Sequence, residues 1–341
     1  MQKEKLYGKT LDELIFVTKR LKLPAFTAKQ IADWLYKKKI SAIDEMTNLS
    51  KKGRELLAAE YDYGIYPPED FSESIDGTKK YLYKVNNDKY IETAYIPDND
   101  RATICLSSQI GCKMGCLFCM TAKQGFQGNL TSNEILNLFR SLPEFDTLTN
   151  IVYMGMGEPL DNLNEVLKSL TILTSEWGYG WSPTRITVST VGLLEPIKEF
   201  LEKSKAHLAV SLHSPFDTER QALMPIQRTN SVKDILDVIR GFELGGQRRI
   251  SFEYILFKGV NDTPKHVKEL ARILNGIKCR INIIRFHELP DSDFKSPDLA
   301  ETIKFKEALN AKGILTTIRA SRGLDIKAAC GLLSTLKHDK S

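Results

Sequence analysis

Apolar residues recur along the chain with a period that changes at two points. Before residue 60 they keep a helical spacing, as in Leu11, Leu14, Ile15 and Thr18, which predicts short helices. Residues 71–97 alternate instead, with Asp76-Gly77 as a turn signal. This second pattern predicts a small β-meander.

From residue 103 onward, short β-rich apolar runs alternate with helical stretches. The runs are Thr103–Ser107, Asn150–Met154, Arg185–Ser189, His207–Leu212, Ile250–Leu256, Arg280–Phe286 and Ile314–Ile318. Strands that alternate with helices imply a parallel sheet with helices on its outer side. About six such units fit an incomplete (β/α)6 barrel of the α/β class better than a full barrel of eight.

The changes of pattern divide the chain into three parts. Residues 1–62 are expected to form a small helical accessory domain, 63–98 a β-meander linker, and 99–341 the barrel domain. A chain of 341 residues is longer than one compact core usually holds, which agrees with this division.

Composition excludes several classes of protein. With 42% hydrophobic and 27% charged residues, the chain is unlike an extended disordered protein. No apolar run is long enough to cross a bilayer, and residues 1–23 contain no hydrophobic signal segment. We therefore expect a cytoplasmic protein without a membrane partner.

The excess positive charge is confined to the N-terminal part. Residues 1–60 contain 13 Lys or Arg and 8 Asp or Glu, whereas the other 281 residues contain 35 of each. A basic accessory domain on a neutral body suggests a polyanionic partner such as RNA, because Lys and Arg displace counterions from phosphates. A lysine-rich helical surface without such a partner explains the charge equally well.

Four of the six cysteines lie within fifteen residues, and three of them form the motif Cys112-x-x-x-Cys116-x-x-Cys119 after the first barrel strand. Three thiolates at this spacing can hold three irons of one [4Fe–4S] cluster. The fourth iron is then left without a protein ligand and can bind a substrate. Two alternatives remain, a zinc site completed by a distant residue and an electron-transfer cluster with a remote fourth ligand.

The cysteine motif, the aromatic Phe118 and the glycine-rich stretch from Met154 to Pro159 resemble radical S-adenosylmethionine (SAM) enzymes. The resemblance implies a [4Fe–4S] cluster whose open iron chelates SAM, and reductive cleavage of SAM to a 5′-deoxyadenosyl radical. It also implies a small reductant such as flavodoxin or ferredoxin.

Further motifs are similar to the RlmN/Cfr family of RNA methyltransferases. They include Cys105-Leu-Ser-Ser-Gln-Ile-Gly-Cys112, Gly125-Phe-Gln-Gly-Asn-Leu-Thr131, Ser211-Leu-His-Ser-Pro215 and the stretch from Arg319 to Gly331. The second motif and Ser321-Arg322-Gly323 look more like the branch that methylates adenine C2 in 23S rRNA and tRNA. Arg285 is also a feature of the C8 enzymes, which confer antibiotic resistance, so C8 methylation is the alternative. A monomer is the default for an enzyme that docks on large RNA.

The family resemblance implies roles for three residues. Cys330 takes a methyl group from one SAM by nucleophilic attack, and a radical from a second SAM activates that group for addition to the adenine carbon. Cys105 then forms a transient disulfide with Cys330 and releases the product. Glu92 is the base that takes the adenine proton. Without the resemblance, the two cysteines would be interpreted as small apolar residues and Glu92 as a solvated strand residue.

The resemblance also marks the cofactor contacts. They are Gly157, Glu158, Ser189, Ser211, Leu212 and His213, together with His287. Several of them end predicted strands, where barrel enzymes place their sites. At the position of His287, family members commonly have Asn, so this contact departs from the family pattern.

Two functions of other kinds remain open at this stage. One is a metal-stabilised RNA-binding module without redox chemistry, which the cysteine motif and the basic N-terminus allow. The other is an activating enzyme that installs a glycyl radical, although that function gives no reason for the Cys330 motif.

Overall fold

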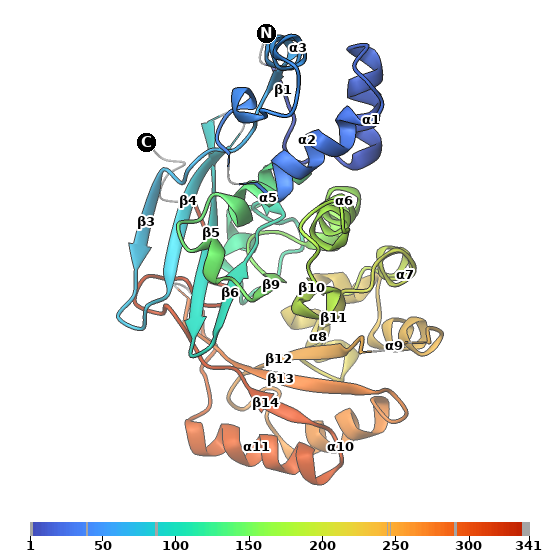
Figure 1. The fold of residues 1–341 in the computed structure, drawn as a ribbon. Helices are drawn as coiled ribbons and strands as arrows, with labels where there is room; N and C mark the ends of the chain where they lie inside the picture. The colour runs from blue at the N-terminus through green and yellow to red at the C-terminus, as the bar shows by residue number, and fades with distance from the viewer. Residues whose placement is uncertain are drawn as a thin grey trace.

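The computed structural model describes residues 3–38, 40–85, 88–243, 245, 247–289 and 292–335. Their main feature is a curved mixed sheet (Figure 1). Its strands, in chain order, are β3 (Asp70–Glu73), β4 (Lys79–Val85), β5 (Lys89–Asp98), β6 (Arg101–Cys105), β9 (Asn150–Tyr153), β10 (Ile186–Thr190), β11 (His207–Ser211), β12 (Ile250–Leu256), β13 (Cys279–Arg285) and β14 (Thr316–Ile318). A small separate hairpin pairs β7 (Gln109–Ile110) with β8 (Gly128–Asn129).

The strands from β6 to β14 run parallel, in the spatial order β6-β9-β10-β11-β12-β13-β14. Each of the seven apolar runs expected from the sequence overlaps one of them, with boundaries that differ by up to two residues at either end. In β12 every residue is buried, as expected for a strand covered on both faces. The expected α/β class and incomplete barrel are therefore confirmed, with sheet edges at β14 and β3.

Helices connect the parallel strands and cover the outer side of the sheet (Figure 1). They are α5 (Ser132–Arg140), α6 (Leu163–Thr174), α7 (Leu194–Lys203), α9 (Val232–Arg240), α10 (Pro264–Ile273) and α11 (Leu299–Ala311). Two short helices, α4 (Met120–Gln124) and α8 (Asp217–Leu223), lie instead near the carboxyl ends of the strands. Four short 3-10 turns supplement them: η3 (Phe145–Thr147), η4 (Pro159–Asn162), η5 (Pro183–Arg185) and η6 (Pro225–Arg228). Among the described residues, none of the helices is long and apolar enough to cross a bilayer.

The predicted meander continues the barrel sheet. Strands β3, β4 and β5 pair antiparallel with one another, and β5 pairs antiparallel with β6 through the partners Ala94 and Cys105. The expected turn at Asp76-Gly77 joins β3 to β4, and Gly77 has a φ of +80°. The boundaries between the three parts of the chain stay a prediction.

The N-terminal segment forms the expected short helices, seen in blue in Figure 1. They are α1 (Leu11–Arg20), α2 (Thr27–Tyr36) and α3 (Lys51–Glu60), with the turn η1 (Ile43–Glu45) and the parallel pair β1 (Glu4–Lys5) and β2 (Tyr61–Asp62). Thr10 and Glu13 start α1 with a reciprocal capping box. The buried face of α1 contains Leu14, Val17 and Thr18, whereas Ile15 is 47% exposed.

The segment after β14 returns to the meander and to α4. The backbone N–H of Gly323 donates to Asp76 Oδ2 at 2.9 Å. Farther along, the N–H of Met120 donates to the Gly331 carbonyl at 2.8 Å, and Thr121 Oγ1 donates to the Leu333 carbonyl at 2.7 Å. This C-terminal segment, residues 319–335, is therefore tied down on both sides of Cys330.

Candidate active site

A cavity of about 230 Å³ lies at the carboxyl ends of the parallel strands. Strands β6, β9, β10, β11 and β12 contribute Cys105, Val152, Ser189, Ser211 and Glu253 to its wall, and the C-terminal segment contributes Cys330. Active sites of parallel α/β barrels are built at this end of the strands. Most of the residues predicted from scattered sequence motifs thus line one cavity.

Three expected cluster ligands lie on the loop between β7 and α4. Cys112 and Cys116 are buried, and Cys119 is half-buried at the position that caps the N-terminus of α4. The loop begins at Gly111, whose φ is +69° and where an added Cβ would lie 1.6 Å from the Gly125 carbonyl oxygen. Only glycine fits there, and this tight turn directs the cysteines into the cavity.

The chemistry of the three thiols fits an iron–sulfur cluster. Burial raises the pKa of Cys112 to about 12 and also raises the pKa values of Cys116 and Cys119, so each thiolate needs a bound cation. No three His, Cys, Asp or Glu side chains of the described residues converge as ligands of a single metal ion. In a cubane each cysteine binds a different iron.

Glu158 is held in the cavity wall by the backbone. Its carboxylate accepts hydrogen bonds from the N–H groups of Val191, at 2.8 Å, and Leu160, at 3.1 Å. Burial raises the pKa of Glu158 to about 7, although these hydrogen bonds oppose the shift. Gly157 has a φ of +99°, and a Cβ there would lie 2.5 Å from the Cβ of Gln109. A side chain at position 157 would therefore collide with Gln109, so glycine is required at this point of the cavity wall.

Of the four expected SAM contacts on or directly after β10 and β11, three line the cavity and one does not. Ser189, Ser211 and His213 line the cavity. Leu212, between the last two, is 2% exposed and its side chain belongs to the main hydrophobic core. Successive residues of a strand point to opposite faces, so Leu212 is outside the cavity lining and offers a ligand only its backbone.

Both expected histidines line the cavity in the neutral form. Burial lowers the pKa of His213 to about 3, and its Nδ1 accepts the N–H of Ile255 at 3.0 Å. Phe118 contacts the His213 ring edge-on, with 4.7 Å between centroids. Burial and then Arg285 lower the pKa of His287. Neutral rings can donate or accept hydrogen bonds but add no charge to the cavity.

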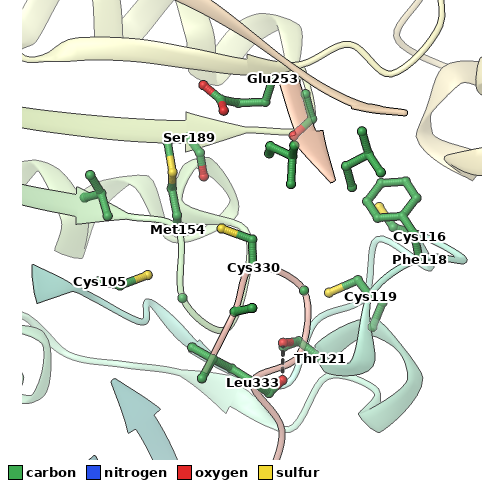
Figure 2. Close-up of a pocket in the computed structure, with 18 of the residues that line it drawn as sticks. Cys105, Cys116, Phe118, Cys119, Thr121, Met154, Ser189, Glu253, Cys330 and Leu333 are labelled. Carbon is green, nitrogen blue, oxygen red and sulfur yellow. Dashed lines mark hydrogen bonds between the residues drawn. The ribbon is translucent and has the colours of Figure 1, made fainter. Parts of the chain in front are cut away.

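Cys105 and Cys330 lie in the same cavity despite their separation in the sequence. Figure 2 shows the Cys330 thiol between Cys105 on one side and Cys119 on the other. Burial and the neighbouring Cys330 raise the pKa of the Cys105 thiol to about 12, while Arg319 opposes the shift. Cys330 is exposed, and all six cysteines are free, so the transient disulfide implied by the family resemblance is not formed in this structure and stays a prediction.

Glu92 is not among the residues that line the cavity. It is 3% exposed, which contradicts its interpretation as a solvated strand residue. Lys80 Nζ forms an ion pair with its Oε1 at 2.8 Å, and the Ser334 N–H donates to its Oε2 at 2.9 Å. The C-terminal segment therefore covers the carboxylate, and Leu333, next to Ser334, belongs to the cavity wall.

The sequence reasoning missed three charged residues around the site. Glu253 and Arg319 line the cavity as an ion pair, and Arg220 is fully buried behind Ser211. A signal existed for Glu253, because it is the only charged residue in the otherwise buried run Ile250–Leu256. No comparable local signal marks Arg220, which lies in the polar helix α8.

Comparisons with known proteins agree with this site. The radical SAM superfamily model matches residues 106–274, and the model of the ribosomal RNA large subunit methyltransferase N-terminal domain matches residues 5–61. A curated relative from Bacteroides fragilis strain YCH46, named a probable dual-specificity RNA methyltransferase RlmN, is 57% identical over 100% of this chain and 99% of its own. This chain belongs to the RlmN family. A more distant RlmN from Campylobacter curvus is 41% identical over 97% of this chain and 94% of its own.

The fold of this chain also matches that of a solved methyltransferase. A radical SAM methyltransferase from Sphaerobacter thermophilus has a solved structure with a TM-score of 0.90 and 37% identity, covering 97% of this chain and 99% of that one. Because the superfamily match includes the cysteine motif, the alternative of a metal-stabilised RNA-binding module without redox chemistry loses its support. Radical SAM proteins imply a [4Fe–4S] cluster and SAM, and RlmN enzymes act on RNA.

Proposed function

We propose that this protein methylates C2 of an adenine in 23S rRNA and in tRNA. Full-length RlmN relatives support the reaction class, since their names describe dual-specificity RNA methyltransferases. The observation that carries the proposal is the pair Cys105 and Cys330 beside the three-cysteine loop in one cavity. Radical SAM chemistry alone does not require this second pair of thiols.

The cofactors of the proposed reaction are a [4Fe–4S] cluster and SAM. Cys112, Cys116 and Cys119 would hold the cluster. The SAM contacts would be Gly157, Glu158, Ser189, Ser211, the Leu212 backbone, His213 and His287. Bound together, these groups would supply a methyl group and a 5′-deoxyadenosyl radical. A small reductant such as flavodoxin or ferredoxin would provide the electron.

Cys330 would act as the methyl carrier. Adenine C2 is an electron-poor carbon and does not attack a sulfonium methyl group, so the methyl must first reach a better nucleophile. A cysteine sulfur serves this purpose, and Cys330 is both exposed and inside the cavity. Cys105 would attack the Cys330 sulfur after transfer, form a disulfide and release the methylated base. Its location beside Cys330 supports this role.

Glu92 would accept the C2 proton. Its ion pair with Lys80 keeps a charged acceptor at the edge of the site. The N–H of Ser334 occupies one of its oxygens, so the C-terminal segment has to shift before Glu92 reaches a bound base. The basic N-terminal domain would bind RNA phosphates, and the target adenine would be flipped into the cavity of a monomeric enzyme.

Anaerobic turnover of a ribosomal RNA fragment, followed by mass-resolved nucleoside chromatography, tests the proposal. We expect 2-methyladenosine from the wild-type protein. The Cys279→Ala variant should form it as well, because Cys279 is a cysteine of β13 outside the residues that line the cavity. A peak of 8-methyladenosine would transfer the protein to the C8 branch. Absence of both products from cluster-loaded protein would refute RNA methylation.

A further inference from the structure

The cavity contains an ion pair that the proposed reaction does not use. Arg319 follows β14 directly, and Glu253 belongs to β12. Arg319 Nη1 lies 3.4 Å from Glu253 Oε2 and 3.1 Å from Met154 Sδ. The Glu253 side chain is 5% exposed and that of Arg319 is 30% exposed. Removing a charge pair from water costs free energy. A pair kept in the cavity wall despite this cost is a candidate for a functional contact.

The Glu253 carboxylate has further hydrogen bonds besides the ion pair with Arg319. Its Oε1 accepts hydrogen bonds from Ser251 Oγ at 3.0 Å and from Asn282 Nδ2 at 2.8 Å. Thr317 in turn donates to Asn282 Oδ1 at 2.8 Å. Three neighbouring strands thus hold the carboxylate in one position, and the carboxylate orients the Arg319 guanidinium.

The guanidinium keeps unused donors. Both of its hydrogen bonds leave from Nη1, and within the described residues Nε and Nη2 of Arg319 have no hydrogen-bond partner. These two nitrogens are not fully buried, and Arg319 lines the cavity. Three N–H donors are therefore accessible from the cavity.

These donors lie on the side of the cavity where Cys105 and Cys330 are found. In Figure 2, Met154, which touches Arg319, lies beside Cys330 and near Cys105, with Glu253 beyond it. Ile96, Val152 and Ala328 complete this side of the wall. A flat ring with an apolar face and an acceptor on its edge fits such a compartment. The cluster loop, where a SAM carboxylate would bind, is on the other side of Cys330.

We propose that Arg319, oriented by Glu253, recognises the target adenine by donating a hydrogen bond to one of the two ring nitrogens that flank C2. This inference rests on the proposed function, since it requires an adenine beside Cys330. Arginine donates and cannot accept. Guanine has an N1–H donor where adenine has an acceptor, so it would leave a donor aimed at N1 unpaired. For a contact to N3, which accepts in both bases, the 2-amino group of guanine would crowd the guanidinium instead. Such mismatches reject a wrong substrate strongly.

Direct binding measurements with altered RNA test the contact separately from catalysis. We would use cluster-loaded protein and a fluorescent RNA stem-loop that contains adenosine, 1-deazaadenosine or 3-deazaadenosine at the target position. Wild-type protein should bind one deaza analogue about tenfold more weakly, as expected for loss of a hydrogen bond to a charged donor. In the Arg319→Met variant this difference should fall below about twofold.

Two further variants make the result decisive. Arg319→Met leaves the Glu253 carboxylate unpaired, so the double variant Arg319→Met/Glu253→Gln repeats the test without a buried orphan charge. Arg322→Met is the matched control. It removes another cavity guanidinium, but one whose Nη2 is bound to Asp98 at 2.8 Å, so the tenfold preference should remain.

The inference and the proposed function can fail independently. If the Arg319 variants keep the tenfold preference, or if wild-type protein binds all three RNAs equally, the contact does not exist. Loss of SAM binding with an unchanged RNA preference would also overturn it and assign Arg319 to the cofactor. Formation of 2-methyladenosine by the wild-type protein is measured separately, and its absence would refute the function rather than the contact.

Discussion

Replacement of Arg220 by lysine should weaken the backbone structure around the site while every residue proposed to react stays in place. Arg220 lies on α8, is fully buried and has an almost saturated guanidinium. Its acceptors are Val191 O at 2.6 Å, Ser211 O at 3.0 Å, Leu212 O at 3.2 Å, Gln227 Oε1 at 2.6 Å and Asn230 O at 3.4 Å. One side chain thus joins the ends of β10 and β11 to the turn after α8.

The magnitude follows from the number of acceptors. Lysine keeps the charge but has three donors at a single nitrogen, so at least two of the five acceptors lose their partner. Each unsatisfied buried acceptor costs about 1–3 kcal/mol, which gives about 2–6 kcal/mol for Arg220→Lys. Because a protein domain is stable by about 5–15 kcal/mol, the variant should fold but with a large loss of stability.

SAM binding should weaken together with stability. Val191, which accepts from Arg220, is also the residue whose N–H holds the Glu158 carboxylate. The other carbonyls belong to Ser211 and Leu212, in the stretch expected to contact the cofactor. Displacement of these segments would disturb the proposed SAM contacts on two strands without removing a proposed cluster ligand.

The assay compares denaturant unfolding and equilibrium SAM binding of reconstituted proteins. Arg240→Lys is the control, since Arg240 is 40% exposed and bonds the Ile273 carbonyl and Asp237 at the surface. It should change stability by no more than about 0.5 kcal/mol. If Arg220→Lys is also within about 0.5 kcal/mol of wild type and binds SAM normally, the reasoning from the five hydrogen bonds is wrong.

Three other substitutions test the cysteines and their loop. Cys330→Ala should abolish both methyl loading, measured by intact mass, and turnover, and retained methylation would remove its carrier role. Cys105→Ala should trap a covalent RNA–protein adduct that shifts a band on a denaturing gel, whereas lost activity without an adduct would make Cys105 structural. Gly111→Ala should prevent iron incorporation because its Cβ meets a carbonyl oxygen at 1.6 Å. Gly180→Ala is its control, with a similar φ of +66° but open space around it, and normal iron content in both variants or loss in both would contradict the steric argument.

The fold could be predicted to a large extent because its signals are local. Strands of a parallel sheet are buried on both faces and therefore appear as continuous apolar runs, as in β12. The three cluster cysteines are also a local pattern, since one loop carries them. In α1 the local pattern was less reliable, because Ile15 and Val17 both fit a helical spacing and only packing against the rest of the protein decides which is buried.

Less of the candidate site than of the fold could be predicted from the residues alone. Nothing in the sequence spacing brings Cys105 to Cys330, and the family resemblance provided that pair. Alternation within β5 suggested a solvated Glu92, but the C-terminal segment covers that face of the strand. Such contacts depend on tertiary structure and leave no local pattern. Leu212 is the opposite case, because strand alternation alone could have shown that its side chain points away from the cavity.

The distribution of site residues along the chain explains how a common barrel can perform a specialised reaction. The superfamily match at residues 106–274 contains the three cluster cysteines and, except for His287, the expected SAM contacts. Glu92, Cys105 and Cys330, which would handle the methyl group and the RNA base, all lie outside it: Glu92 on the meander, Cys105 at the end of the first barrel strand β6, and Cys330 on the C-terminal segment. Hydrogen bonds from Gly323 to Asp76 and from Ser334 to Glu92 join these two flanks. In the proposed reaction, the barrel would therefore supply a general radical site, while the first barrel strand and the two flanks would determine what that radical acts on.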